Sequence, residues 1–367
     1  MKRDVIIALV ALMALCGSIV AAGGTLSERD GRLRGYVDAT QTADLPFRGP
    51  LLGVNAELTR YDDEELAAQL DWMETAHMHW VRQFARWDEI EPQEGVYDWS
   101  AWDRITEAFA GRDLELVAVL VNSPAWARTT SGEASLAPTN DVLERSAPPD
   151  DPAAFGRFAA ALAARYGQTV DVYQVWDEPN LTTAWGGGEP QAVDYAALLQ
   201  AGYRAIHSAD QGATVIAAAL APTSENTALN ISDIAYLDDL YRLGAADFMD
   251  AAAAKPYGFD TPPNDTTVDP NGLNFGRIVA LRDVMLKYGD GKKALWAAAW
   301  GWNSLPEDWT GAPSIWGDVT ADQRAAYTVG ALERAEREWP WIGGMIVQQW
   351  QPDAPPDDPQ WGFALMD

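Results

Sequence analysis

The feature that most constrains this chain is a regular alternation of short apolar runs and longer amphipathic segments from residue 51 onward. Most of the apolar runs are nearly continuously hydrophobic, which is typical of parallel strands buried on both faces. The expected strands cover residues 51–55, 79–84, 114–121, 170–176, 213–220, 248–254, 294–299 and 343–350. The expected helices cover residues 62–75, 99–110, 152–166, 192–208, 232–243, 274–288 and 321–338. This pattern predicts an α/β fold, a (β/α)8 TIM barrel that lacks the last helix.

Composition excludes several classes of function. The formal net charge is −28, and no basic run follows Arg3, which argues against nucleic acid as a partner. The only cysteine is Cys16, in the apolar leader, so we expect neither disulfides nor thiolate chemistry in the folded part. Three histidines, His77, His79 and His207, are too few to suggest a metal site or a Ser-His-Asp triad. We therefore expect no metal and no cofactor, and any catalysis is expected to use carboxylates.

Residues 1–24 have the pattern of a targeting segment. Lys2 and Arg3 precede an uncharged stretch that runs from Val5 to Ala22 and ends in small residues. The stretch predicts either a cleaved signal peptide or a retained membrane anchor. In both cases the rest of the chain is expected to be extracytoplasmic, secreted or held at a membrane. Residues 25–50 are then a linker, and residues 51–367 form the barrel.

The functional site of such a barrel lies at the carboxyl ends of its strands. The residues expected there are Asn55, Glu57, Arg82, Arg86, Asn122, Trp126, Asp177, Glu178, Asn180, Lys255, Tyr257, Trp302, Trp350 and Asp353. Indole rings stack on the C–H faces of sugars, while carboxylates, amides and arginines bind the hydroxyls. This mixture, in a chain with 17 tryptophans, predicts a carbohydrate ligand, with Trp126, Trp302 and Trp350 as stacking platforms.

Several motifs carry a resemblance to a known family. They are Val81-Arg82, WDEIEP at 87–92, GVYDW at 95–99, WDEPN at 176–180, KPYG at 255–258 and LWAAAWGW at 295–302. In type and order these motifs resemble those of the clan A glycoside hydrolases, the cellulase- and β-xylosidase-type retaining enzymes. The resemblance runs from about residue 51 to residue 367. It implies a TIM-barrel glycosidase that acts on a poly- or oligosaccharide.

The resemblance also implies roles for single residues. Glu178 matches the general acid/base that protonates the leaving oxygen. Asp177 falls where the family usually has an asparagine that binds the sugar 2-hydroxyl, and Lys255 replaces the usual histidine before Pro-Tyr-Gly. Arg82 and Tyr257 match residues that normally hold the nucleophile. The expected substrate-binding set consists of Asp177, Lys255, Arg82, Tyr257, Asn180, Asn122, Trp126, Trp302 and Trp350.

The nucleophile of the family is missing, because Ala299 stands where the family has glutamate. Glycoside hydrolysis normally needs a pair of carboxyl groups, so this loss affects the mechanism directly. Asp177 is expected to point away from the site of Glu178, since neighbouring strand residues face opposite sides of a sheet. Glu57 and Asp353 are the more plausible substitute carboxylates, as bases for a water in an inverting scheme.

Three hypotheses follow from these residues. The protein is an exported glycoside hydrolase that uses Glu178 and a displaced carboxylate. Alternatively, it is a carbohydrate-binding pseudo-glycosidase that has lost hydrolysis. In the third hypothesis, Glu178 only pairs with Lys255 or Arg82 in an ion network.

Overall fold

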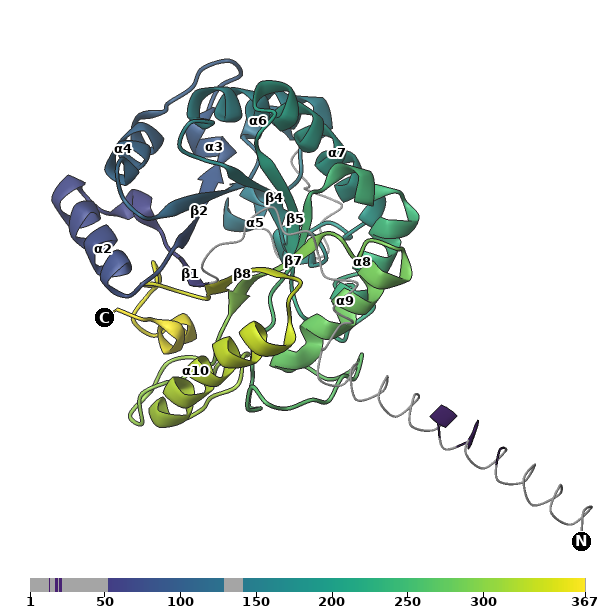
Figure 1. Ribbon diagram of the computed structural model, residues 1–367. Coiled ribbons are helices and arrows are strands. Elements are labelled where there is room, and N and C mark those ends of the chain that lie inside the picture. Colours follow the sequence, from purple (N-terminus) through teal and green to yellow (C-terminus); the bar gives the residue numbers. More distant parts are fainter. Residues whose placement is uncertain (1–12, 14–16, 19, 22–51, 129–140, 367) are drawn as a thin grey trace, which may run out of the picture.

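The computed structural model describes residues 52–128 and 141–366, together with residue 13, residues 17–18 and residues 20–21. Eight parallel strands follow one another around a closed barrel, in which β1 pairs with both β2 and β8 (Figure 1). The strands are β1 (Leu52–Asn55), β2 (Trp80–Arg86), β3 (Glu115–Val121), β4 (Val172–Asp177), β5 (Thr214–Leu220), β6 (Ala251–Ala254), β7 (Ala294–Trp300) and β8 (Ile342–Val347). The predicted (β/α)8 barrel is therefore confirmed.

Helices surround the barrel, as Figure 1 shows. The α-helices are α2 (Asp63–Thr75), α3 (Trp87–Ile90), α4 (Ser100–Phe109), α5 (Asp141–Arg145), α6 (Pro152–Tyr166), α7 (Ala192–Ala209), α8 (Asp233–Arg242), α9 (Ile278–Lys287) and α10 (Ala321–Glu338). Short 3-10 helices are η2 (Leu58–Arg60), η3 (Ala125–Ala127), η4 (Thr182–Ala184), η5 (Ala245–Phe248), η6 (Phe275–Arg277) and η7 (Pro359–Phe363). The long helices agree with the predicted ranges to within a few residues, whereas α3, α5 and the 3-10 helices were not predicted.

Two tryptophans fill the inside of the barrel. The rings of Trp80 on β2 and Trp296 on β7 meet edge to face, with centroids 5.0 Å apart, and both are almost fully buried. Their bulk requires small neighbours, because barrel interiors are as closely packed as organic crystals. A Cβ at Gly53 would lie 2.5 Å from the Trp80 Cβ, and one at Gly343 would lie 2.2 Å from Trp296 Nε1. The alanine-rich strands β6 and β7 supply the other small side chains of this core.

The segment after β8 differs from the other repeats, as the sequence predicted. No α-helix follows β8 in residues 348–366, where the described chain contains η7 instead. This segment returns to the barrel, because the backbone N–H groups of Leu365 and Met366 both donate to the Trp350 carbonyl. It also carries Phe363 to a buried position beside Ala299 at the end of β7. The C-terminal segment thus contributes to the mouth of the barrel.

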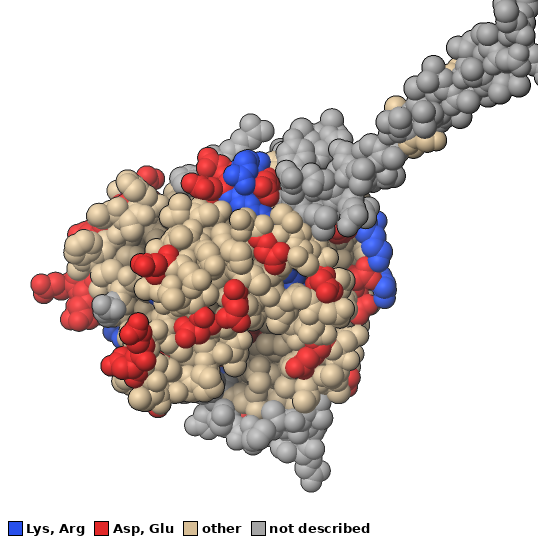
Figure 2. Space-filling view, turned by 90° about the horizontal axis from the view of Figure 1, so that it is seen from below, with Lys and Arg blue, Asp and Glu red and all other residues tan. Residues whose placement is uncertain are grey.

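The predicted leader and linker fall almost wholly outside the described residues. Of the helices in the described parts of the chain, none combines the length and the apolar character needed to cross a membrane. Acidic side chains are scattered over the face drawn in Figure 2, and basic ones are few there. This distribution agrees with the sequence, which contains 54 acidic and 26 basic residues.

Candidate functional site

A network of buried charges occupies the mouth of the barrel at the end of β4. Lys255 Nζ, just after β6, donates to Asp177 Oδ2 at 2.7 Å and to Glu178 Oε1 at 2.8 Å. Arg82 Nη2 on β2 donates to Asp177 Oδ1 at 2.7 Å, and Gln174 Nε2 donates to the same oxygen at 3.1 Å. Both oxygens of Asp177 are therefore fully engaged. The ion pair of Glu178 with Lys255 that the third hypothesis required is present.

Burial and charge act in opposite directions on the ionisable groups of this network. Burial alone would raise the pKa of Asp177, but the charges of Lys255 and Arg82 outweigh it and hold the pKa below its usual value. Burial would lower the pKa of Lys255, yet the carboxylates of Asp177 and Glu178 raise it. Asp177 is thus a carboxylate and Lys255 an ammonium at neutral pH.

The backbone at the end of β4 departs from a regular strand. Trp176 has a φ of 67° and Glu178 a φ of 51°, both in the left-handed region that non-glycine residues rarely adopt. The usual alternation of side chains is lost, so Asp177 and Glu178 both reach the same ammonium. The expectation that Asp177 points away from the site of Glu178 is therefore wrong. The two oxygens that bind Lys255 Nζ lie no more than about 5.5 Å apart, because their distances to it are 2.7 Å and 2.8 Å. The two carboxylates are therefore close enough to be compared with the carboxyl pair of a glycosidase.

Apolar side chains surround Ala299, the position that the resemblance assigns to the nucleophile. Ala299 is 2% exposed and packs with Tyr257 and Phe363, and Phe259 and Trp316 pack against this cluster. The phenol of Tyr257, which the resemblance assigns to holding a nucleophile, donates instead to Gln348 Oε1 at 2.8 Å. The β6–β7 side of the mouth is thus aromatic, with no carboxylate in this cluster.

The two substitute carboxylates proposed from the sequence lie elsewhere. Glu57 forms an ion pair with both Nη atoms of Arg86 and accepts further bonds from Gln83 and Thr59. Burial opposes its ionisation, but the bond from Arg86 and its charge lower its pKa overall. Asp353 is exposed, and its charge adds to the effect of burial in raising the pKa of Tyr61. Neither carboxylate lines the cavity that contains Glu178, so the structure gives no support to either as a base.

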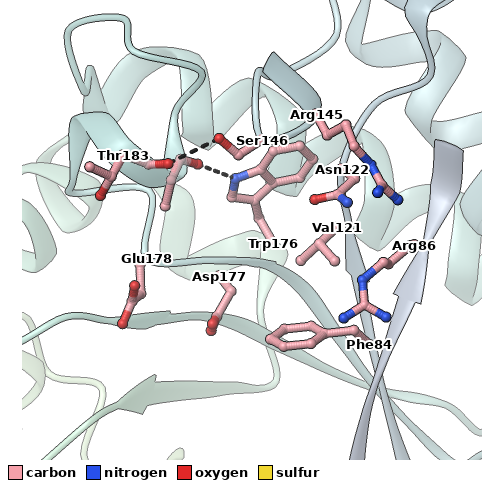
Figure 3. Close-up of a pocket in the computed structure, with 11 residues that line it drawn as sticks. Phe84, Arg86, Val121, Asn122, Arg145, Ser146, Trp176, Asp177, Glu178 and Thr183 are labelled. Atoms are coloured by element: carbon pink, nitrogen blue, oxygen red, sulfur yellow. Dashed lines mark hydrogen bonds between the residues drawn. The ribbon is translucent and has the colours of Figure 1, made fainter. Parts of the chain in front are cut away.

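A cavity of about 290 Å³ opens beside Glu178 (Figure 3). It lies on the β2–β4 side of the mouth and is lined by Phe84, Arg86, Val121, Asn122, Arg145, Ser146, Trp176, Asp177, Glu178, Thr183 and Ala184. Trp176 is fixed by a bond from its Nε1 to the Ala184 carbonyl at 3.0 Å. Three lining residues, Asn122, Trp176 and Glu178, have positive φ values. Such strained backbone is concentrated at functional sites in proteins, which makes this cavity the candidate site.

Of the residues expected at the strand ends, Glu178, Asp177, Asn122 and Arg86 line this cavity. Arg82 and Lys255 lie directly behind it, since they bind its carboxylates. Arg86 was expected at a strand end, but without a role. Phe84, Arg145, Ser146 and Thr183 were not expected at the site. Strand β2 continues to Arg86, two residues past its predicted end, whereas no sequence signal marked Arg145, which ends the short helix α5.

The predicted tryptophans and Asn180 lie in the protein core or pack against it. Trp302 and Trp350 are 1% and 2% exposed, and their indole N–H groups donate to the Thr261 carbonyl and to Gln69. Asn180 is fully buried and bonds only backbone groups. Trp126 is partly buried and donates to the Glu91 carbonyl. The prediction that Trp302, Trp350 and Asn180 bind substrate is therefore wrong for this structure, because their side chains are used in packing.

Among the described residues, no group of three or more histidine, cysteine, aspartate or glutamate side chains is placed to hold a metal ion. The polar groups that line the cavity are two carboxylates, two guanidinium groups, one amide and two hydroxyls.

Comparison with known proteins supports the fold. The Glyco_hydro_42 family model, described as Beta-galactosidase, matches residues 58–141. A family 39 glycoside hydrolase from the gut symbiont Bacteroides cellulosilyticus WH2 superimposes with a TM-score of 0.61 at 18% identity, over 89% of this chain and 60% of that one. A monomeric beta-xylosidase from Caulobacter crescentus CB15 gives a TM-score of 0.61 at 20% identity, over 90% and 67% of the two chains. A beta-galactosidase from the psychrophilic Marinomonas ef1 gives 0.55 at 13% identity, over 85% and 56%.

The chain therefore has the fold of the clan A glycoside hydrolases, as the motifs indicated. It spans 60% of the length of the Bacteroides structure. No curated protein sequence matches it significantly. At identities of this order a shared fold carries no information about activity, which has to be argued from the site itself.

Proposed function

We propose that this protein binds a saccharide in the cavity beside Glu178 and does not hydrolyse it by the usual two-carboxylate mechanism. The observation that carries the proposal is the position of Ala299. Its methyl group is buried under Tyr257 and Phe363, at the position where the resemblance to the clan A glycoside hydrolases implies the second carboxylate. Glu178 keeps its place at the cavity with a partly exposed side chain. The cleft is retained, while its second reactive group is lost.

The lining of the cavity suits a sugar. Phe84 is partly exposed and adds an aromatic surface to the cavity, with the guanidinium groups of Arg82 and Arg86 over its ring. Asn122, Ser146 and Thr183 place an amide and two hydroxyls around the same space. Small-molecule sites commonly combine such an apolar surface with a few polar groups that fix the orientation of the ligand.

Two features of the charge network argue against hydrolysis. Retaining catalysis needs a free carboxylate to attack the sugar, and Asp177 is bonded on both oxygens to Arg82, Gln174 and Lys255. The ammonium of Lys255 also lies between Asp177 and Glu178, in the space that a reacting carbon would have to enter. Their short separation therefore does not supply the missing pair.

A binding and turnover comparison tests this proposal. Titrations followed by tryptophan fluorescence and calorimetry would use xylo-, gluco- and galacto-oligosaccharides, and aryl β-glycosides of the same sugars would report hydrolysis. We expect saturable binding without measurable turnover, and weaker binding in Glu178→Gln. The matched control Glu64→Gln changes an exposed glutamate on α2 and should leave binding unchanged. Turnover that disappears in Glu178→Gln would favour an active hydrolase, and absence of binding to any sugar would refute the proposal.

We also propose that the protein is exported, because residues 1–24 have the pattern of a signal peptide or anchor. Fractionation of cells that express the full chain, with N-terminal sequencing of the product, tests this. Recovery of the intact chain in the cytoplasm would contradict it.

A further inference from the structure

The candidate cavity is polarised. Arg86, at the end of β2, and Arg145, at the end of α5, lie with Asn122 on the side away from Glu178 (Figure 3). We call Arg86 and Arg145 the arginine end of the cavity, and Asp177 and Glu178 its carboxylate end. The function proposed above uses the carboxylate end and assigns nothing to the arginine end.

Carboxylates outside the cavity hold both guanidinium groups in place. Arg86 uses its two Nη atoms for Glu57, whose side chain is 11% exposed. Arg145 bonds Asp88 through Nε and Glu89 through Nη2. Neither Glu57, Asp88 nor Glu89 lines the cavity. Their bonds fix the planes of the two guanidinium groups before any ligand arrives, which reduces the entropy lost on binding.

Donor groups remain for a ligand. A guanidinium group has five N–H bonds, and Arg145 Nη1 makes no hydrogen bond to the described part of the chain. The Arg145 side chain is 38% exposed and that of Arg86 is 24% exposed, so both are open to solvent while they line the cavity. The Arg86 guanidinium carbon also lies over the Phe84 ring, 5.5 Å from its centre. A sugar in contact with Phe84 would therefore have its substituents next to a guanidinium group.

We propose that the arginine end binds the anionic group of an acidic saccharide, either the carboxylate of a uronic acid or a sulfate ester. Two guanidinium groups converging on one small space are typical of anion recognition, because their N–H groups match the oxygens of such groups in pairs. The sugar ring then contacts Phe84, and its uncharged end faces Glu178. This proposal rests on the saccharide binding proposed above and adds the class of sugar.

The large negative charge of the protein does not prevent this contact. Glu57, Asp88 and Glu89 already balance the charge of the two guanidinium groups, so an anion would be held by their remaining N–H groups and not by a net positive charge. Charges farther away than about 8 Å are largely screened at physiological ionic strength. The contacts should therefore dominate for a single acidic sugar, while long polyanions would meet more repulsion from the chain with its net charge of −28. Short ligands are accordingly the right probes.

The experiment compares sugars that differ in one substituent. Calorimetry at 0.15 M salt would measure methyl β-D-glucuronide, methyl β-D-glucoside and its 6-sulfate, and the corresponding galacto-series. We expect at least one acidic member to bind about tenfold or more tightly than its neutral counterpart, as charge-assisted hydrogen bonds imply. The glucuronide and the sulfate distinguish a carboxylate from a sulfate ester as the preferred group.

Variants test the assignment to the arginine end. Arg145→Met should abolish the preference for the acidic sugar, and so should Arg145→Met with Asp88→Asn, in which the local net charge is unchanged. The double variant separates loss of the guanidinium contact from exposure of an unpaired carboxylate. Arg157→Met, at an exposed arginine on α6 that is paired with Glu94, should keep the preference.

The outcomes distinguish the two proposals. If neutral sugars bind as tightly as acidic ones, or if the preference survives in Arg145→Met, the acidic-saccharide inference is overturned while saccharide binding stands. If no sugar of either series binds, saccharide binding itself fails, and the inference fails with it.

Discussion

Replacement of Lys255 by methionine tests the charge network most directly. The substitution keeps the length of the side chain but removes the ammonium that binds Asp177 at 2.7 Å and Glu178 at 2.8 Å. At an effective dielectric constant of about 20, each contact is worth about 6 kcal/mol of attraction. The desolvation of a side chain that is only 9% exposed offsets much of this.

We expect Lys255→Met to lower the free energy of unfolding by about 3–5 kcal/mol at pH 7, as removal of one partner from a buried ion pair usually does. Lys287→Met provides the matched control. It removes an ammonium from an ion pair with Asp238 in which the lysine side chain is 57% exposed. Such exposed pairs contribute about 1 kcal/mol or less, so the control should change stability little.

The pKa shifts predict how the stability difference between wild type and Lys255→Met changes with pH. The folded-state pKa of Asp177 is lowered, so its contribution to stability is present above the unfolded value of about 4 and is lost as the pH falls through the folded value. The contribution of Lys255, whose pKa is raised, is present throughout the acid and neutral range. The difference between wild type and Lys255→Met should therefore be largest near pH 7 and should shrink below about pH 4.

Urea denaturation followed by tryptophan fluorescence at pH 7 and at pH 3.5 measures this difference. A change below about 1 kcal/mol at pH 7 would refute the reasoning, because it would place the pair in the range of exposed ion pairs. A large change that is independent of pH would also refute it, since the loss would then come from packing and not from charge.

Two further predictions concern packing. Ala299→Glu alone should give no glycosidase turnover, because the longer side chain meets Tyr257 and Phe363. Ala299→Glu combined with Phe363→Ala should yield measurable aryl glycoside hydrolysis. Equal inactivity of both variants would contradict the idea that packing around Ala299 closes this position. Gly343→Ala should destabilise the protein by about 1–3 kcal/mol, because its methyl group would lie 2.2 Å from Trp296 Nε1; an unchanged melting temperature would show that the barrel interior has room to spare.

The fold was predictable because its signals are local. Buried parallel strands are continuously apolar, whereas the apolar residues of the intervening helices recur about every 3.6 positions. Each strand and helix can therefore be recognised from its own residues. Small errors at the boundaries still had consequences for the site. The predicted second strand ended at Phe84, whereas β2 continues to Arg86, and this extension carries a guanidinium group to the cavity.

The site was only partly predictable. Glu178 and Asp177 were found because they end an apolar strand, but the assumption of regular alternation placed Asp177 wrongly. The positive φ values of Trp176 and Glu178 that bring both carboxylates to Lys255 have no signature in residue type. Trp302 and Trp350 were misinterpreted for a related reason, since an indole near a strand end can either face a ligand or fill the core.

By itself, the sequence determined the eight-stranded barrel, the carboxylate at the end of the fourth strand and the alanine near the end of the seventh, because each depends on residue type and order. Only the tertiary structure decided which groups meet at the mouth. Phe363 covers Ala299, Lys255 bridges two carboxylates, and Arg145 joins Arg86 at one cavity. These contacts join residues that are far apart along the chain, and packing and charge, rather than local pattern, select such pairs.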